Sequence, residues 1–186
     1  ADIAEQGLED YPVEVLAHEI GHHVLAPANL ANHGRMLARM RKALPTLEQH
    51  APLIANLFTD LLINDRLQRS AGLRMADVYK KLQKGTPSGK VWQLYMRIYE
   101  LLWSLERGTL SGAKPGTDQF EGDARLGARV VRHFARNWLD ASGRFATLLL
   151  PYIVEDAKKA KLPDNWHDTR HAGKGGEPAG LSDIDP

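Results

Sequence analysis

The chain has 186 residues, with 24 basic and 23 acidic side chains and no cysteine. This length suffices for one sizeable core, and a net charge of +1 gives no general reason to expect nucleic acid or an anionic membrane as a partner. Without thiolates, any metal ion must be held by His, Asp or Glu. Because no apolar run approaches the roughly 20 residues of a membrane span and the acidic start differs from a signal peptide, we expect a soluble, cytoplasmic protein.

The first predicted helix covers residues 13–27, with Pro12 in its first turn and Pro27 at its end. Apolar residues recur along it at helical spacing, which predicts one face that packs against the rest of the protein. They are Val13, Leu16, Ala17, Ile20 and Val24.

Apolar periodicity predicts further helices along most of the chain, and no segment alternates as a strand would. We therefore expect a mainly α fold: a compact helical domain over residues 1–162, followed by a flexible linker or tail over residues 163–186, where Gly, Pro and charged residues dominate. The further predicted helices are residues 34–44, 52–69, 75–82, 91–105, 119–139 and 144–160.

The sequence HEIGH at residues 18–22 has the form His-Glu-x-x-His. Residues four apart share one face of an α-helix, so His18 and His22 point the same way and can bind one metal ion. Glu19 lies beside them, where its carboxylate can take a proton from a metal-activated water. Gly21 is a poor helix former that permits close approach of another backbone. The alternative is a solvated helix that carries these residues by chance.

Hydrolytic zinc usually takes three protein ligands, and the residues after the motif lack the further histidine of metzincins. A polar line of Asn56, Asp60 and Asn64 runs along the predicted helix 52–69 at spacings of one turn. We assign Asp60 as the third ligand and Asn64 as an amide whose oxygen accepts a ligand histidine's N–H. Asp65 is the rival for either role. The alternative is that these residues are caps or surface pairs.

Other polar and aromatic residues are expected to support the fold rather than to act in the site. Glu121 and Asp123 are expected to be favourable acids in a helix first turn rather than ligands. Tyr95 and Tyr99, one turn apart, are expected in the core, although a phenol could also serve a tetrahedral intermediate. His23 points away from His22 and is expected to pack near the site rather than to bind metal.

The segments HEIGHHVLAP and LFTDLLINDRLQ resemble bacterial zincin-type metallopeptidases, of the kind associated with MoxR ATPases and von Willebrand A domain proteins. The resemblance covers about residues 11–69. It implies that zinc is bound by His18, His22 and Asp60, with Glu19 as base and acid. It also implies a peptide or protein substrate, and an ATPase or von Willebrand A type protein as a candidate partner. Thermolysin-like enzymes use glutamate as third ligand, so the shorter Asp60 requires its helix to lie closer to the metal.

Zincins place a sheet before the motif helix, and its edge strand holds the peptide by backbone hydrogen bonds. Little sequence precedes the motif here, so we expect that sheet to be reduced, missing or located upstream in a longer chain. The sequence thus predicts a zinc metallopeptidase. A non-catalytic zinc-binding helical scaffold that docks a protein partner is the main rival, and hydrolysis of a non-peptide amide is a third reading.

Overall fold

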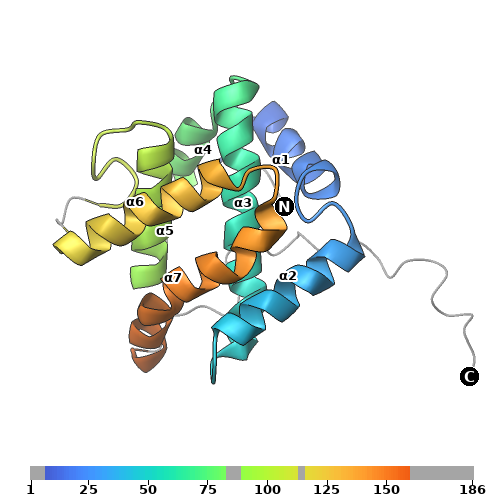
Figure 1. Cartoon of the computed structure of the whole chain (residues 1–186). Coiled ribbons are helices and arrows are strands. Elements are labelled where there is room, and N and C mark those ends of the chain that lie inside the picture. Colours follow the sequence, from blue (N-terminus) through green and yellow to red (C-terminus); the bar gives the residue numbers. More distant parts are fainter. Residues whose placement is uncertain (1–6, 83–88, 113–115, 160–186) are drawn as a thin grey trace, which may run out of the picture.

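The computed structural model describes residues 7–82, 89–112 and 116–159 (Figure 1). These residues form seven α-helices and one short 3-10 helix and include no strand, which confirms the mainly α prediction. The predicted tail at residues 163–186 lies outside the described residues. The elements are α1 (Pro12–Val24), α2 (Leu30–Ala43), η1 (Glu48–His50), α3 (Ala51–Ser70), α4 (Met75–Leu82), α5 (Lys90–Leu102), α6 (Asp118–His133) and α7 (Trp138–Lys158).

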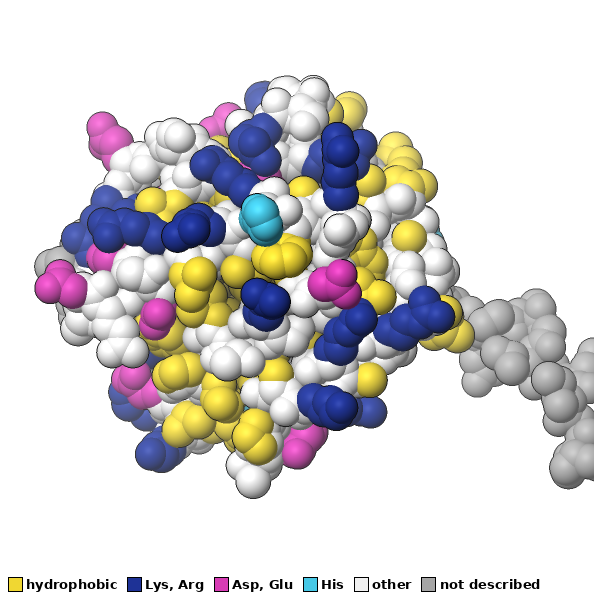
Figure 2. Space-filling model, in the orientation of Figure 1, with side chains coloured by type: hydrophobic (Ala, Val, Ile, Leu, Met, Phe, Trp, Pro, Cys, Tyr) yellow, Lys and Arg dark blue, Asp and Glu magenta, His cyan; other side chains and the backbone are white. Residues whose placement is uncertain are grey.

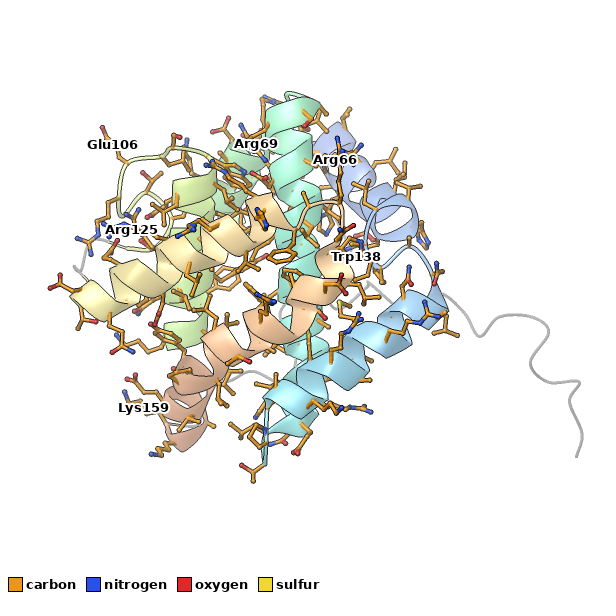
Figure 3. All side chains as sticks on the ribbon, viewed as in Figure 1. Arg66, Arg69, Glu106, Arg125, Trp138 and Lys159 are labelled. Atoms are coloured by element: carbon orange, nitrogen blue, oxygen red, sulfur yellow. The ribbon has the colours of Figure 1, made fainter. Side chains whose placement is uncertain are left out.

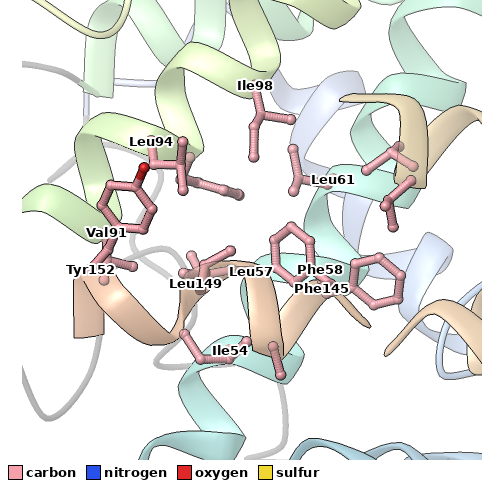
Figure 4. Packing of buried hydrophobic residues seen from close by; sticks show 14 of the residues in the cluster. Ile54, Leu57, Phe58, Leu61, Val91, Leu94, Ile98, Phe145, Leu149 and Tyr152 are labelled. Carbon is pink, nitrogen blue, oxygen red and sulfur yellow. The ribbon is translucent and has the colours of Figure 1, made fainter. Parts of the chain in front are cut away.

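Helix α3 is the centre of the fold, and α1, α2, α4, α5 and α7 all pack against it (Figure 1). Its middle is buried on every side because these helices surround it, and its apolar residues join one core cluster with residues of α5 and α7. Figure 4 shows this core, in which Phe58 stacks on Phe145 with ring centroids 4.9 Å apart. Polar residues on α3 are therefore carried into the interior together with its apolar ones.

The turn between α6 and α7 differs from the prediction. Helix α6 ends at His133 and α7 begins at Trp138, whereas the sequence predicted one helix over residues 119–139 and a second from residue 144. The intervening residues include neither Gly nor Pro, and the local signal of the break is Asn137, a residue type common at helix starts, which directly precedes α7. The chain turns where α6 and α7 pack against each other.

The face of α1 that packs against the rest of the protein is not the one that the sequence predicted. The apolar stripe of this helix faces outward, while its polar face, with buried Glu14 and Gly21, packs on α3. The expectation that this stripe would pack against the described part of the protein is wrong, because the face that carries the motif is the one that meets α3. The exposed fractions of its four larger residues are 61% for Val13, 61% for Leu16, 49% for Ile20 and 63% for Val24, and Ala17 is partly buried.

The remaining surface carries scattered charge. Figure 2 shows Lys and Arg side chains spread among apolar and acidic ones over the face in view. Among the described helices, none has the length and apolar character that a membrane crossing requires.

Candidate metal centre

Helices α1 and α3 approach each other closely at Gly21. A Cβ added to Gly21 would overlap Cγ2 of Ile63 and lie 3.2 Å from Cγ1 of the same side chain. Only glycine permits this backbone separation, as the sequence suggested. The close contact allows an aspartate, despite its short side chain, to reach from α3 to the histidines of α1.

Three potential ligand atoms converge between the two helices. Nε2 of His22 lies 3.2 Å from Nε2 of His18 and 3.3 Å from Oδ1 of Asp60. The distance from His18 Nε2 to the same oxygen is 3.7 Å. Ligand atoms about 2.0–2.2 Å from one tetrahedral ion lie roughly 3.3–3.6 Å apart. The structure thus brings together the three residues that were predicted as ligands, at spacings that suit a shared ion.

Asp60 is buried, and the groups nearest to its charge are the two histidines, which offset that charge only when they are protonated. Its exposed fraction is 1%, and neither carboxylate oxygen has a hydrogen bond among the described residues. A buried carboxylate in this state is costly unless a cation or a proton neutralises it. Together with the two imidazoles, this carboxylate makes a group that could hold a metal ion.

Asn64 lies on α3 one turn beyond Asp60 and contacts the ring nitrogen of His18 that does not face Asp60. Its Oδ1 is 2.8 Å from Nδ1 of His18, which is the contact predicted for a residue that orients a metal ligand. Its Nδ2 donates to the hydroxyls of Tyr79, at 3.0 Å, and Tyr99, at 2.9 Å. The amide therefore links a candidate ligand to the aromatic core.

Tyr79, Tyr95 and Tyr99 form what we call the tyrosine cluster. Their hydroxyls lie 3.0–3.2 Å from one another, and their exposed fractions are 3% or less. Burial, together with the nearby charge of Asp60, raises the pKa of Tyr99 well above its ordinary value, so this phenol keeps its proton. The sequence placed Tyr95 and Tyr99 in the core correctly, but it gave no sign that Tyr79 would join them or that the hydroxyls would reach Asn64.

Asp65, the predicted rival of Asp60 and Asn64, is not part of the group that could hold a metal ion. It is buried, and its carboxylate pairs with Arg69 one turn further along α3, with Oδ1 accepting from Nε at 2.7 Å. Figure 3 shows Arg69 at the C-terminal end of this helix. This ion pair gives the buried carboxylate of Asp65 a partner of its own.

The other candidates lie elsewhere. Glu121 pairs with Arg97 and Arg107, and Asp123 accepts a hydrogen bond from Tyr152 at 2.7 Å. His23 is exposed, which corrects the expectation that it would pack near the site. Asn56, the first residue of the predicted polar line, has a buried Nδ2 without a hydrogen-bond partner among the described residues.

Glu19 is partly exposed and lies on α1 between the ligand face and the outer face. Among the described residues, no hydrogen bond or ion pair engages its carboxylate, although its charge acts on His22. The carboxylate is therefore available to a water or substrate near the ligand atoms.

Protons and any metal ion bound at this group would compete for His22. Burial lowers the pKa of this imidazole, but the adjacent Asp60 carboxylate, with a contribution from Glu19, outweighs burial and raises the pKa above its usual value. The metal-free protein thus gains stability from protonated His22 below the unfolded pKa of about 6.5, and loses it as pH rises through the folded pKa. Metal binding needs the neutral imidazole and has the opposite dependence.

We therefore expect the increase in Tm on adding Zn²⁺ to be larger at about pH 8 than at about pH 6. Over the same interval, the Tm of the metal-free protein should fall relative to that of a His22→Gln variant. Thermal unfolding with zinc and with chelator, at both pH values, measures both trends. A zinc-induced shift that does not change with pH would contradict the competition.

Comparison of the chain with models of protein families, with curated proteins and with solved structures finds no match. The functional interpretation therefore depends on the fold and on the geometry of this site. These define a mainly α-helical protein with a candidate metal centre between α1 and α3.

Proposed function

We propose that the protein is a zinc-dependent metallopeptidase in which His18, His22 and Asp60 hold the ion and Glu19 is the general base and acid. The observation that carries this proposal is the convergence of two imidazole nitrogens on a buried carboxylate without a hydrogen bond. A purely structural polar cluster would be expected to satisfy its own carboxylate, as Asp65 and Arg69 do.

The donor set favours zinc over other common ions. Two imidazoles and one carboxylate suit Zn²⁺, whereas Mg²⁺ and Ca²⁺ prefer oxygen ligands alone. Three protein ligands leave a coordination position open, as in hydrolytic rather than structural zinc sites. When bound by these three residues, zinc would supply a Lewis acid that polarises a carbonyl and makes water more acidic.

The chain's own residues would then move the proton. The Glu19 carboxylate accepts a proton from the attacking water and delivers it to the nitrogen of the leaving amine, so that the carboxylate is regenerated. Asn64 holds His18 through Nδ1 and so keeps Nε2 directed at the site. The proposed substrate is a peptide or protein.

A second candidate is a non-catalytic zinc-binding scaffold. Two observations favour it: the apolar stripe of α1 is exposed, and the described residues include no strand that could hold an extended peptide. In this case, zinc would fix α1 to α3, and the helical body would dock a protein partner, for which an ATPase or a von Willebrand A type protein is our candidate.

Glu19→Gln separates the two candidates. We expect the zinc-loaded wild type to cleave a fluorescence-quenched peptide library, and the variant to lose at least about 100-fold in kcat, because proton transfer contributes about that much. Zinc content should be unchanged, because Glu19 is not among the ligands. Metal analysis and peptidase assays on the same preparations measure both quantities.

Glu106→Gln is the matched control, since Glu106 is exposed and lies after the end of α5 (Figure 3). It removes the same charge and should retain full activity. Equal slow cleavage by the wild type and Glu19→Gln, with zinc bound in both, would reject the peptidase and leave the scaffold.

A further inference from the structure

Five short contacts join the amide of Asn64 to the tyrosine cluster. Asn64 Nδ2 lies 3.0 Å from the Tyr79 hydroxyl and 2.9 Å from that of Tyr99. The three hydroxyls contact one another at 3.1 Å (Tyr79 and Tyr95), 3.2 Å (Tyr79 and Tyr99) and 3.0 Å (Tyr95 and Tyr99). Each contact has the geometry of a hydrogen bond and needs one proton, and the two longer hydroxyl pairs, at 3.1 and 3.2 Å, lie just beyond the usual range of about 2.5–3.0 Å for an O–H···O bond.

The number of available protons depends on the direction of the amide. With the NH₂ group toward the tyrosines, two N–H and three O–H groups supply one proton for each of the five contacts. With the amide turned over, every contact joins two oxygens, and only the three phenol protons remain for them. Two oxygen pairs would then face each other without a proton, whatever else the tyrosines contact. The network therefore favours the first direction, in which all five contacts have a proton.

The direction of the Asn64 amide determines which ring nitrogen of His18 carries the proton. When NH₂ faces the tyrosines, Oδ1 faces His18 Nδ1 at 2.8 Å and can only accept, so Nδ1 must carry the imidazole proton. We infer that the tyrosine cluster sets the tautomer of His18 through Asn64, which leaves the lone pair of Nε2 directed at His22 and Asp60 before any metal binds. Tyr79 and Tyr99 are thus positioning residues that touch neither ion nor substrate.

The tautomer of His18 decides whether its Nε2 can bind a metal ion without a prior proton shift. A histidine that carries its proton on Nε2 must change tautomer before Nε2 can bind an ion, whereas His18 is already in the form that binds. This role rests on the proposed metal site, but the tautomer itself is a property of the metal-free protein. The two can therefore be tested separately.

The test is NMR of the imidazole nitrogens in metal-free protein labelled with ¹⁵N-histidine, at about pH 9, well above the usual histidine pKa of about 6.5. Long-range ¹H–¹⁵N correlations distinguish a protonated from an unprotonated ring nitrogen, and His18→Gln assigns the signals. We expect His18 in the wild type to carry its proton on Nδ1. In Tyr79→Phe/Tyr99→Phe, the amide loses both acceptors, and the form with the proton on Nε2 should appear to a comparable extent.

Tyr95→Phe is the matched control. It removes the same hydroxyl from an equally buried tyrosine that does not contact Asn64 in the network, and it leaves three contacts with four protons in the favoured direction but only two in the other. His18 should keep its proton on Nδ1. Adding Asn64→Asp to the double variant should restore the wild-type tautomer, because a carboxylate can only accept from Nδ1.

A wild-type His18 with its proton on Nε2 would overturn the inference, even if the double variant does not fold. An unchanged Nδ1 tautomer in a folded double variant would overturn it as well. We also expect about 10-fold weaker zinc binding in the double variant and little change in Tyr95→Phe, measured by chelator competition. If the wild type binds no zinc while the tautomers behave as stated, the proposed function fails and this inference stands.

Discussion

Asp60→Asn is expected to abolish zinc binding and, at the same time, to stabilise the metal-free protein. Asp60 is 1% exposed, and both of its oxygens lack hydrogen bonds among the described residues. Asparagine has the same shape, carries no charge and can donate an N–H to an imidazole nitrogen. Because a buried polar group without a partner costs about 1–3 kcal/mol, we expect the variant to gain about 1–2 kcal/mol in free energy of unfolding at about pH 9.

With zinc added, the wild type should become more stable than Asp60→Asn. A ligand at about 1,000 times its Kd stabilises the folded state by about 4 kcal/mol, and only the wild type would receive this contribution. Denaturant unfolding of both proteins, with chelator and with zinc, measures the reversal. A variant that binds zinc as tightly as the wild type would show that Asp60 is not a ligand.

Asp65→Asn is the control for this experiment. Asp65 is also a buried carboxylate on α3, but it is paired with Arg69. Its removal should therefore lower stability with and without zinc, and leave zinc affinity unchanged. Two equally small side-chain changes, five residues apart, would thus have opposite effects on the metal-free protein.

Gly21→Ala is expected to be the most damaging single-methyl change in α1. Its Cβ would overlap the side chain of Ile63, which is fully buried, so α1 must move away from α3. Overpacking of this kind costs about 1–3 kcal/mol, and better helix propensity returns at most about 1 kcal/mol. Because α1 carries two of the candidate ligands and α3 the third, we expect zinc affinity to fall as well, as measured by chelator competition.

Gly34→Ala provides the comparison. Gly34 also lies inside a helix, but a Cβ there would meet nothing within 4 Å, so the substitution should stabilise the protein by up to about 1 kcal/mol. Combining Gly21→Ala with Ile63→Ala should restore part of the zinc affinity by removing the overlap. If Gly21→Ala alone binds zinc normally, close approach of the two helices is not what positions Asp60.

Much of the candidate site could be predicted because its geometry is local. His18 and His22 are one turn apart on a single helix, and that spacing fixes their relation whatever the rest of the fold. Asp60 and Asn64 could be proposed because polar residues in line on an otherwise apolar helix need a partner in the interior. The structure places both of them against the histidines of α1.

What could not be predicted depends on long-range packing. The apolar stripe of α1 was expected to be buried, but a period in the sequence identifies a face without saying which neighbour it meets. Likewise, the hydroxyl of Tyr79 meets Tyr99 across 20 residues of sequence, and aromatic periodicity alone indicates only a core position. Asp65 was a candidate for the role of Asp60 or Asn64, but its pairing with Arg69 was not expected.

The separation of the candidate ligands along the chain also bears on the unfolded state. In an unfolded chain, His18 and His22 stay close because only three residues separate them. Asp60 can reach them only by closing a loop of about 40 residues, which includes the residues that form α2 in the folded protein. Closing such a loop costs about 3 kcal/mol in entropy. An ion held by all three residues would therefore favour the folded over the unfolded chain strongly, even though two of its ligands are neighbours in both. Release of the ion and separation of α1 from α3 should then occur as one event.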